Sequence, residues 1–206
     1  VFCALDGILF YTFFEATLIP MYLIVGVWGG PNKIYAAFKF FLYTLLGSLL
    51  MLVALIYLYV ESGGSFDIAT WHRLPLSSTQ QTLLFFAFFA AFAVKVPMWP
   101  VHTWLPDVHV EAPTGGSAVL AAIMLKLGAY GFLRLVLPFY PVEAQYYAGW
   151  LAFLATMAIV FGAFASFGQT DFKRLVAYSS VNHMGFVLLG IAAAAKAIGT
   201  QDATIA

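Results

Sequence analysis

Charged residues are scarce in this chain. Its 206 residues include nine Lys or Arg and nine Asp or Glu, so that 9% are charged, whereas a soluble domain carries roughly 25%. The formal net charge is zero, and with no basic patch the chain is not expected to bind nucleic acid. Cys3 is the single cysteine, which excludes an internal disulfide and a metal site built from cysteines.

Apolar residues are correspondingly abundant, at 63% of the chain. A sphere of this size could not hide so much apolar surface from water, so the composition predicts an integral membrane protein. The apolar runs are long and continuous, which favours helices over the alternating strands of a membrane barrel. We therefore predict an all-α membrane protein, with residues 1–206 as a single membrane domain. The six candidate spans are 5–28, 40–60, 80–96, 114–137, 144–170 and 174–195.

The third span is followed by a segment that one regular helix cannot cross. Residues 97–113 read PMWPVHTWLPDVHVEAP, with four prolines in seventeen residues, and proline removes a backbone donor and crowds the preceding turn. The segment is nevertheless too aromatic for an ordinary exposed loop. We predict a discontinuous helix, with a first half at 80–96, an interruption near 97–101 and a second half near 101–111. Broken helices at membrane depth occur where the backbone lines a buried or hydrated cavity.

Loop charge predicts the orientation. If the six spans alternate, the 28–39 loop, the 107–113 turn and the 169–174 loop share one side. That side carries four basic residues and the other side two, which places the first side in the cytoplasm. The four are Lys33, Lys39, Lys173 and Arg174, and the two are Arg73 and Lys196.

Four ionisable residues lie within predicted spans, on four different helices. They are Glu15, Lys95, Lys126 and His183. A charge at the centre of a spanning helix costs roughly 2.5–3.5 kcal/mol on insertion scales, and such residues mark transport paths. A desolvated lysine releases its proton more readily, and a nearby carboxylate opposes that release. An acid, two lysines and a histidine at similar depth therefore indicate proton translocation. We expect Glu15 and Lys95 to form a switchable pair, and Lys126 and His183 to share one hydrated polar axis.

The sequence offers no site for a metal or a cofactor. His102 and His109 are seven residues apart in the broken segment, with only Asp107 and Glu111 nearby, and capping or hydration is the simpler use for such a pair. Neither a glycine-rich phosphate motif nor a cysteine cluster is present.

Three segments give the chain a specific resemblance. They are FFEATLIPMYLIVGVWGG at 13–30, TDFKRLVAYSSVNHMG at 170–185, and FAVKVPMWPVHTWLPDVHVEAPTGGSAVLAAIMLKLGAYGFLR from Phe92 to Arg134. Together they resemble the antiporter-like subunits of respiratory complex I (NADH–quinone oxidoreductase), in the branch of subunit M or chain 4. The chain opens without an initiator Met inside a hydrophobic stretch, so we expect it to be a central portion of a longer subunit.

The resemblance implies a function for each of the four buried residues. Glu15 matches the family's glutamate that interacts with the broken-helix lysine, Lys95 matches that lysine, Lys126 the central lysine of the proton path, and His183 the histidine beyond it. It also implies that other membrane subunits of the complex, the lipid bilayer, protons and buried water are the partners. NADH and quinone would be met only through other subunits, so we expect no flavin, iron–sulfur cluster or quinone site in this chain. The expected location is a bacterial inner membrane or an equivalent energy-transducing membrane.

Two alternatives stay open at this point. Multisubunit cation/proton antiporters, membrane-bound hydrogenases and the plastoquinone-reducing complex use closely related chains, which the broken-helix segment alone does not separate. In the second alternative, the chain is a structural membrane subunit whose buried charges only pair with each other. That alternative predicts that neutral replacements leave pumping intact.

Overall fold

The computed structural model describes residues 1–198, which fold into helices packed lengthwise. In chain order these are α1 (Gly7–Ala16), α2 (Leu18–Trp28), α3 (Lys33–Glu61), α4 (Ile68–Trp71), α5 (Ser78–Lys95), α6 (Trp104–Glu111), α7 (Thr114–Val119), η1 (Leu120–Met124), α8 (Leu125–Gly131), η2 (Phe132–Val136), α9 (Leu137–Phe139), α10 (Pro141–Phe167) and α11 (Phe172–Ile198). The all-α membrane architecture predicted from composition is confirmed.

Within residues 1–198, five helical segments are long and apolar enough to cross a membrane. They are Gly7–Trp28, Lys33–Glu61, Thr114–Phe139, Pro141–Phe167 and Phe172–Ile198. The remaining predicted span, 80–96, is the third in the chain and corresponds to the 18-residue helix α5. It is continued after an interruption by α6, as the prolines predicted.

Two boundaries differ from the sequence-based expectation. The first predicted span, 5–28, is interrupted at Thr17. Pro20 does not interrupt it, because Pro20 falls in the first turn of α2, where its missing N–H has no helical partner to lose. The segment between the predicted spans 114–137 and 144–170 is also largely helical. Only Tyr140 separates α9 from α10, which begins at Pro141, and proline is well suited to a first helical position.

The fifth span contains a feature that the sequence did not predict. Two π-helical segments, η1 and η2, lie on either side of α8. The wider hydrogen-bond ring of a π-turn leaves the helix locally irregular, and such bulges are frequent at functional sites. Lys126 is the second residue of α8, directly after η1.

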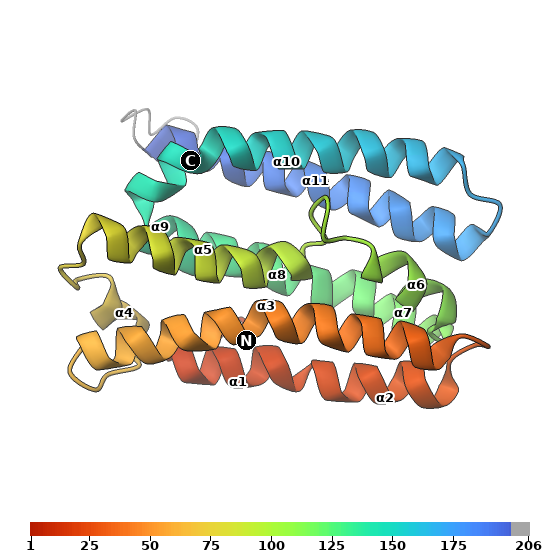
Figure 1. The fold of residues 1–206 in the computed structure, drawn as a ribbon, viewed down its shortest axis with the longest axis horizontal. Coiled ribbons are helices and arrows are strands. Elements are labelled where there is room, and N and C mark those ends of the chain that lie inside the picture. The colour runs from red at the N-terminus through yellow and green to blue at the C-terminus, as the bar shows by residue number, and fades with distance from the viewer. Residues whose placement is uncertain (199–206) are drawn as a thin grey trace.

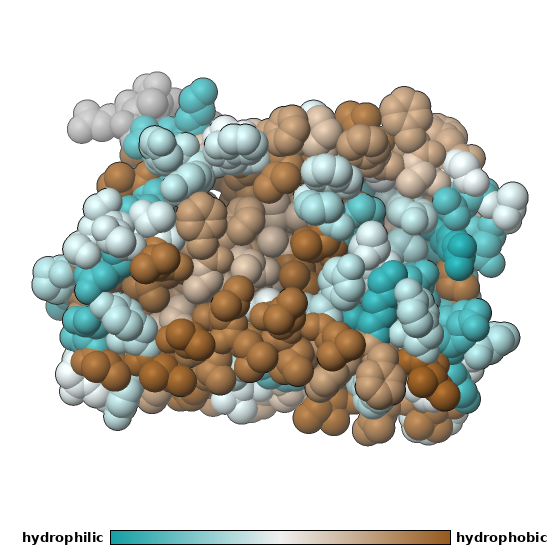
Figure 2. Space-filling model, in the orientation of Figure 1, coloured by the Kyte–Doolittle hydropathy of each residue, from teal (hydrophilic) through white to brown (hydrophobic). Residues whose placement is uncertain are grey.

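The helices lie in layers along the long axis of the molecule (Figure 1). α1 and α2 lie beside α3. The middle layer is formed by α5 and α8, and the hairpin of α10 and α11 lies on the opposite side. Apolar side chains cover the flanks between two more hydrophilic ends (Figure 2). Leu46 on α3 and Trp150 on α10, for example, are 71% and 67% exposed. A surface of this kind suits lipid or further apolar helices.

The three segments predicted to share one side do lie at the same end. The amide of Gly30 donates to the carbonyl oxygen of Glu111 at 2.9 Å, and Lys173 Nζ donates to the carbonyl oxygen of Ala112 at 2.9 Å. At the opposite end, an isolated antiparallel β-bridge joins the backbones of Asp6 and Asp67. The ring centroids of His72 and Phe139 lie 4.3 Å apart at that end. That the first end faces the cytoplasm stays a prediction.

Candidate proton-transfer site

Proline causes the interruption between α5 and α6, and a tryptophan side chain forms a hydrogen bond across it. Pro97 has no N–H for the carbonyl oxygen of Ala93, which instead accepts from the amide of Met98 at 3.0 Å. That shift deprives the carbonyl oxygen of Val94 of its usual amide donor. The indole Nε1 of Trp104, at the start of α6, donates to it at 3.0 Å. The end of α5 is therefore tied directly to the second half-helix.

Lys95 occupies the last position of α5 and is almost completely enclosed. The residue is 2% exposed, and its Nζ has no hydrogen-bond partner in the structure. Nζ lies over the face of the Phe14 ring, 4.5 Å from its centroid. A cation–π contact offsets only part of the cost of desolvating an ammonium. A lysine in this position needs a partner that the surrounding apolar residues do not supply.

Glycines on α8 allow this enclosure. A Cβ at Gly128 would lie 2.6 Å from Cγ2 of Val96, 3.0 Å from Cβ of Lys95 and 3.1 Å from the carbonyl oxygen of Phe92. Only hydrogen fits there, so α8 closes directly against the turn that carries Lys95. Gly131 has the same function one turn on, against the ring of Phe92.

Glu15 lies in the last turn of α1, next to the interruption at Thr17. Its Oε1 is buried without a hydrogen-bond partner. The hydroxyl of Ser48 on α3 lies near the carboxylate. Glu15 directly follows Phe14, whose ring centroid lies 4.5 Å from Nζ of Lys95. No direct ion pair joins the two side chains, because Nζ of Lys95 is unpartnered. The structure thus brings the predicted pair into the same region, where Nζ of Lys95 and Oε1 of Glu15 both lack a hydrogen-bond partner.

The other two predicted residues, Lys126 and His183, are not enclosed. Both are exposed on the surface of the described chain. We expected Lys126 to face polar groups of neighbouring helices. Instead its Nζ donates to the carbonyl oxygen of Ala121, on the same helical segment. Ala121 lies in η1, and the irregular π-turn gives the lysine a local acceptor. The expected shared axis with His183 stays a prediction.

Sequence reasoning gave too little weight to the polar residues of α6 and the segment before it. Nδ1 of His102 and Nε2 of His109 are buried without hydrogen-bond partners, and His109 is 4% exposed. Asp107 forms an ion pair with Lys39 of α3 at 2.6 Å. Polar residues in an otherwise apolar segment were the available signal. Within residues 1–198, no group of three or more His, Cys, Asp or Glu could hold a metal ion.

The chain belongs to the NADH:quinone oxidoreductase/Mrp antiporter transmembrane family, whose model matches residues 4–206. The resemblance inferred from the three sequence motifs is thereby confirmed, and the chain is an integral membrane protein.

Two curated relatives are a subunit M and a chain 4. The chain is 57% identical over 207 residues to NADH-quinone oxidoreductase subunit M of Rhodobacter capsulatus, covering 94% of the chain and 40% of that relative. It is 50% identical over 192 residues to NADH-ubiquinone oxidoreductase chain 4 of Marchantia polymorpha, covering 93% of the chain and 39% of the relative. The chain thus spans about 40% of the length of the curated relatives it matches.

Two solved assemblies contain chains of similar fold. A chain of respiratory complex I from Thermus thermophilus with bound NADH has a TM-score of 0.84 and 34% identity, covering 96% of this chain and 46% of that one. A chain of the Mrp complex from Dietzia sp. has a TM-score of 0.78 and 27% identity, covering 92% of this chain and 21% of that one. Both are multisubunit complexes.

Proposed function

We propose that the chain is the central part of a proton-translocating subunit of an NADH–quinone oxidoreductase. The observation that carries the proposal is Lys95, which is enclosed without a hydrogen-bond partner at the end of a broken helix, with Oε1 of Glu15, also without a partner, nearby. An unpaired buried charge costs several kcal/mol, and proteins retain such groups chiefly for function. The high identity to subunit M and chain 4 sequences supports this function.

In this proposal the protons move by way of Glu15, Lys95, Lys126 and His183, and electron transfer occurs in other subunits. When the charge of Glu15 is drawn toward Lys95, the lysine holds its proton. When the carboxylate moves away or is neutralised, the lysine releases it. Lys126 and His183 carry the proton onward. The subunit acts as a translocase within an energy-transducing membrane.

We also propose that this chain holds no redox centre. Iron–sulfur clusters are held by several cysteine thiolates, and the sequence has one cysteine. NADH, flavin, clusters and quinone would then be bound by other subunits, and the partners of this chain are neighbouring membrane subunits, lipid and water.

The proposal is tested on the assembled complex in sealed vesicles, by measuring pumped protons per electron transferred. We expect Lys95→Met to lower this ratio strongly while the complex stays assembled. Lys196→Met is the matched control, because Lys196 is an exposed lysine in the last turn of α11. An unchanged ratio in the Lys95→Met complex would favour the structural alternative, in which the charges serve only stability.

A second candidate is a subunit of a multisubunit cation/proton antiporter, favoured by the similarity to the Mrp complex. The two are separated by energy source. An antiporter exchanges cations for protons without NADH, whereas the proposed subunit pumps only during electron transfer. Genes for an NADH-oxidising module beside this one would also favour the first proposal.

A further inference from the structure

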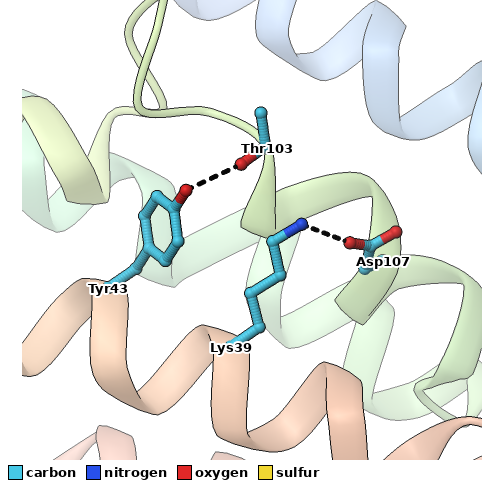
Figure 3. A network of polar contacts seen from close by, with 4 residues as sticks. All are labelled: Lys39, Tyr43, Thr103 and Asp107. Carbon is cyan, nitrogen blue, oxygen red and sulfur yellow. Dashed lines mark hydrogen bonds and ion pairs between the residues drawn. The ribbon is translucent and has the colours of Figure 1, made fainter.

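Two side-chain contacts connect the second half-helix to α3 (Figure 3). Nζ of Lys39 lies 2.6 Å from Oδ2 of Asp107, and the hydroxyls of Tyr43 and Thr103 are 3.0 Å apart. Lys39 and Tyr43 are one turn apart on α3, and Thr103 and Asp107 are one turn apart at the start of α6. Two contacts at this spacing fix both the position of α6 along the axis of α3 and the rotation of α6 relative to α3.

The ion pair differs from an ordinary surface pair in its surroundings. The side chains of Lys39 and Asp107 are 19% and 27% exposed, and Lys39 lies six residues inside the longest membrane-spanning helix. Exposed pairs in water contribute little, because water solvates each charge almost as well as the partner does. For a pair that is largely covered, loss of one partner leaves the other charge unpaired and partly desolvated, which is unfavourable.

The same turn of α3 reaches the site of Lys95 through Trp104. The ring of Phe40, next to Lys39, lies 5.3 Å from that of Trp104, centroid to centroid. The indole of Trp104 in turn donates to the carbonyl oxygen of Val94, the residue before Lys95. A continuous series of contacts therefore runs from Lys39 and Tyr43, through α6, to the backbone that carries Lys95.

We propose that Lys39 and Tyr43 are positioning residues for Lys95. By holding α6 against α3, they keep Trp104 on the carbonyl oxygen of Val94 and keep the last turn of α5 in place beside Glu15. This inference rests on the proposed proton-translocating function. It adds a specific task for two residues that lie outside the proton path itself.

The first measurement reports on the interruption itself. In the full complex with Cys3→Ser, Met98→Cys places a thiol in the connecting segment, where Met98 is 1% exposed. We expect Lys39→Met to raise the rate of labelling of this thiol by a small maleimide by roughly tenfold or more, because local opening becomes easier. Tyr43→Phe should raise it less. Leu58→Cys, also 1% exposed but at the other end of α3, should keep its rate.

The second measurement is pumped protons per electron, with conservative and compensating variants. We expect Lys39→Met and Asp107→Asn each to lower the ratio, and the double variant to lower it no further than either alone. Lys39→Arg and the charge exchange Lys39→Asp with Asp107→Lys should restore both the ratio and the slow labelling. Lys33→Met is the control. Lys33 lies at the same end, and its Nζ donates to the carbonyl oxygen of Val27 and does not reach α6.

Three results would overturn the inference. Unchanged labelling of Met98→Cys in the Lys39→Met complex would show that the pair does not hold the interruption. Equal acceleration at Met98→Cys and Leu58→Cys would show a general loosening. Faster labelling with normal pumping would show that α6 does not position Lys95. Failure of the proposed function is separate, because it appears as normal pumping in the Lys95→Met complex, where labelling still reports on the contact.

Discussion

The two halves of the broken helix are held in opposite ways. The end of α5 is packed by apolar side chains and by the glycines of α8, and its one ionisable group, Lys95, has no hydrogen-bond partner. α6 is held by polar contacts to three segments: Asp107 to α3, Glu111 to the loop before α3, and the carbonyl oxygens of Val110 and Ala112 to Lys173. The first half presents an unsatisfied charge, and the second half is fixed.

This difference suits a site in which the protonation of one residue, Lys95, must depend on the groups around it. Polar contacts are directional, so they hold α6 in one position, whereas apolar packing around Lys95 supplies no competing partner. In the proposed function, the protonation of Lys95 is therefore controlled by Glu15 and by the proton donor that reaches it. If α6 lacked these polar contacts, its backbone could move and bring a polar partner to the unpaired charge of Lys95.

The strongest test of this comparison removes the charge that acts on Lys95. We expect Glu15→Gln to abolish most proton pumping through this subunit, because the amide keeps the shape of the carboxylate but cannot switch the lysine. The measurement is pumped protons per electron in vesicles, with assembly verified by native gel electrophoresis. Normal pumping in the Glu15→Gln complex would contradict a switchable pair.

The next test disturbs the packing of the first half. Gly128→Ala places a Cβ against Lys95, Val96 and the backbone of Phe92, and we expect it to lower the free energy of unfolding by about 1–3 kcal/mol, as overpacking does. Gly149→Ala on α10 is the control, since nothing lies within 4 Å of the added Cβ. It should be neutral or stabilise by about 0.5–1 kcal/mol through helix propensity. Unfolding of the full-length subunit in detergent would measure both, and equal effects would exclude close packing as the cause.

A smaller effect is expected from the hydrogen bond that joins the halves. Trp104→Phe keeps an aromatic ring against Phe40 but leaves the carbonyl oxygen of Val94 without its donor. An unsatisfied buried acceptor costs about 1–3 kcal/mol, and an ordered water at the site would reduce that cost. We expect a loss of stability near the lower limit, together with faster labelling of Met98→Cys. Unchanged labelling would show that the halves are joined by packing alone.

The interruption itself could be predicted from the sequence, because Pro97 and Pro100 act through local backbone chemistry. Glu15 and Lys95 could also be chosen, since any charge within an apolar span is conspicuous. The π-turns around Lys126 could not, because no residue in that span marks them. Nor could the contact of Lys39 with Asp107, 68 residues away. In a span that is apolar on every side, periodicity does not show which face is covered, and so the exposed positions of Lys126 and His183 were not foreseen.

The smallest expected effect concerns the far end of the second half-helix. Nζ of Lys173 donates to the carbonyl oxygens of Val110 at 3.3 Å and Ala112 at 2.9 Å, where α6 ends. The residue is exposed, and a cation near a helix C-terminus contributes about 0.3–1 kcal/mol at low ionic strength. We expect Lys173→Met to lower the stability of the subunit by an amount within this range. Lys173→Arg should retain most of the contribution, because the guanidinium also donates to carbonyl oxygens. The difference between Met and wild type should shrink as salt is raised, since the charge is exposed and screened. A salt-independent loss would indicate that the methylene packing of Lys173, and not its charge, holds the end of α6.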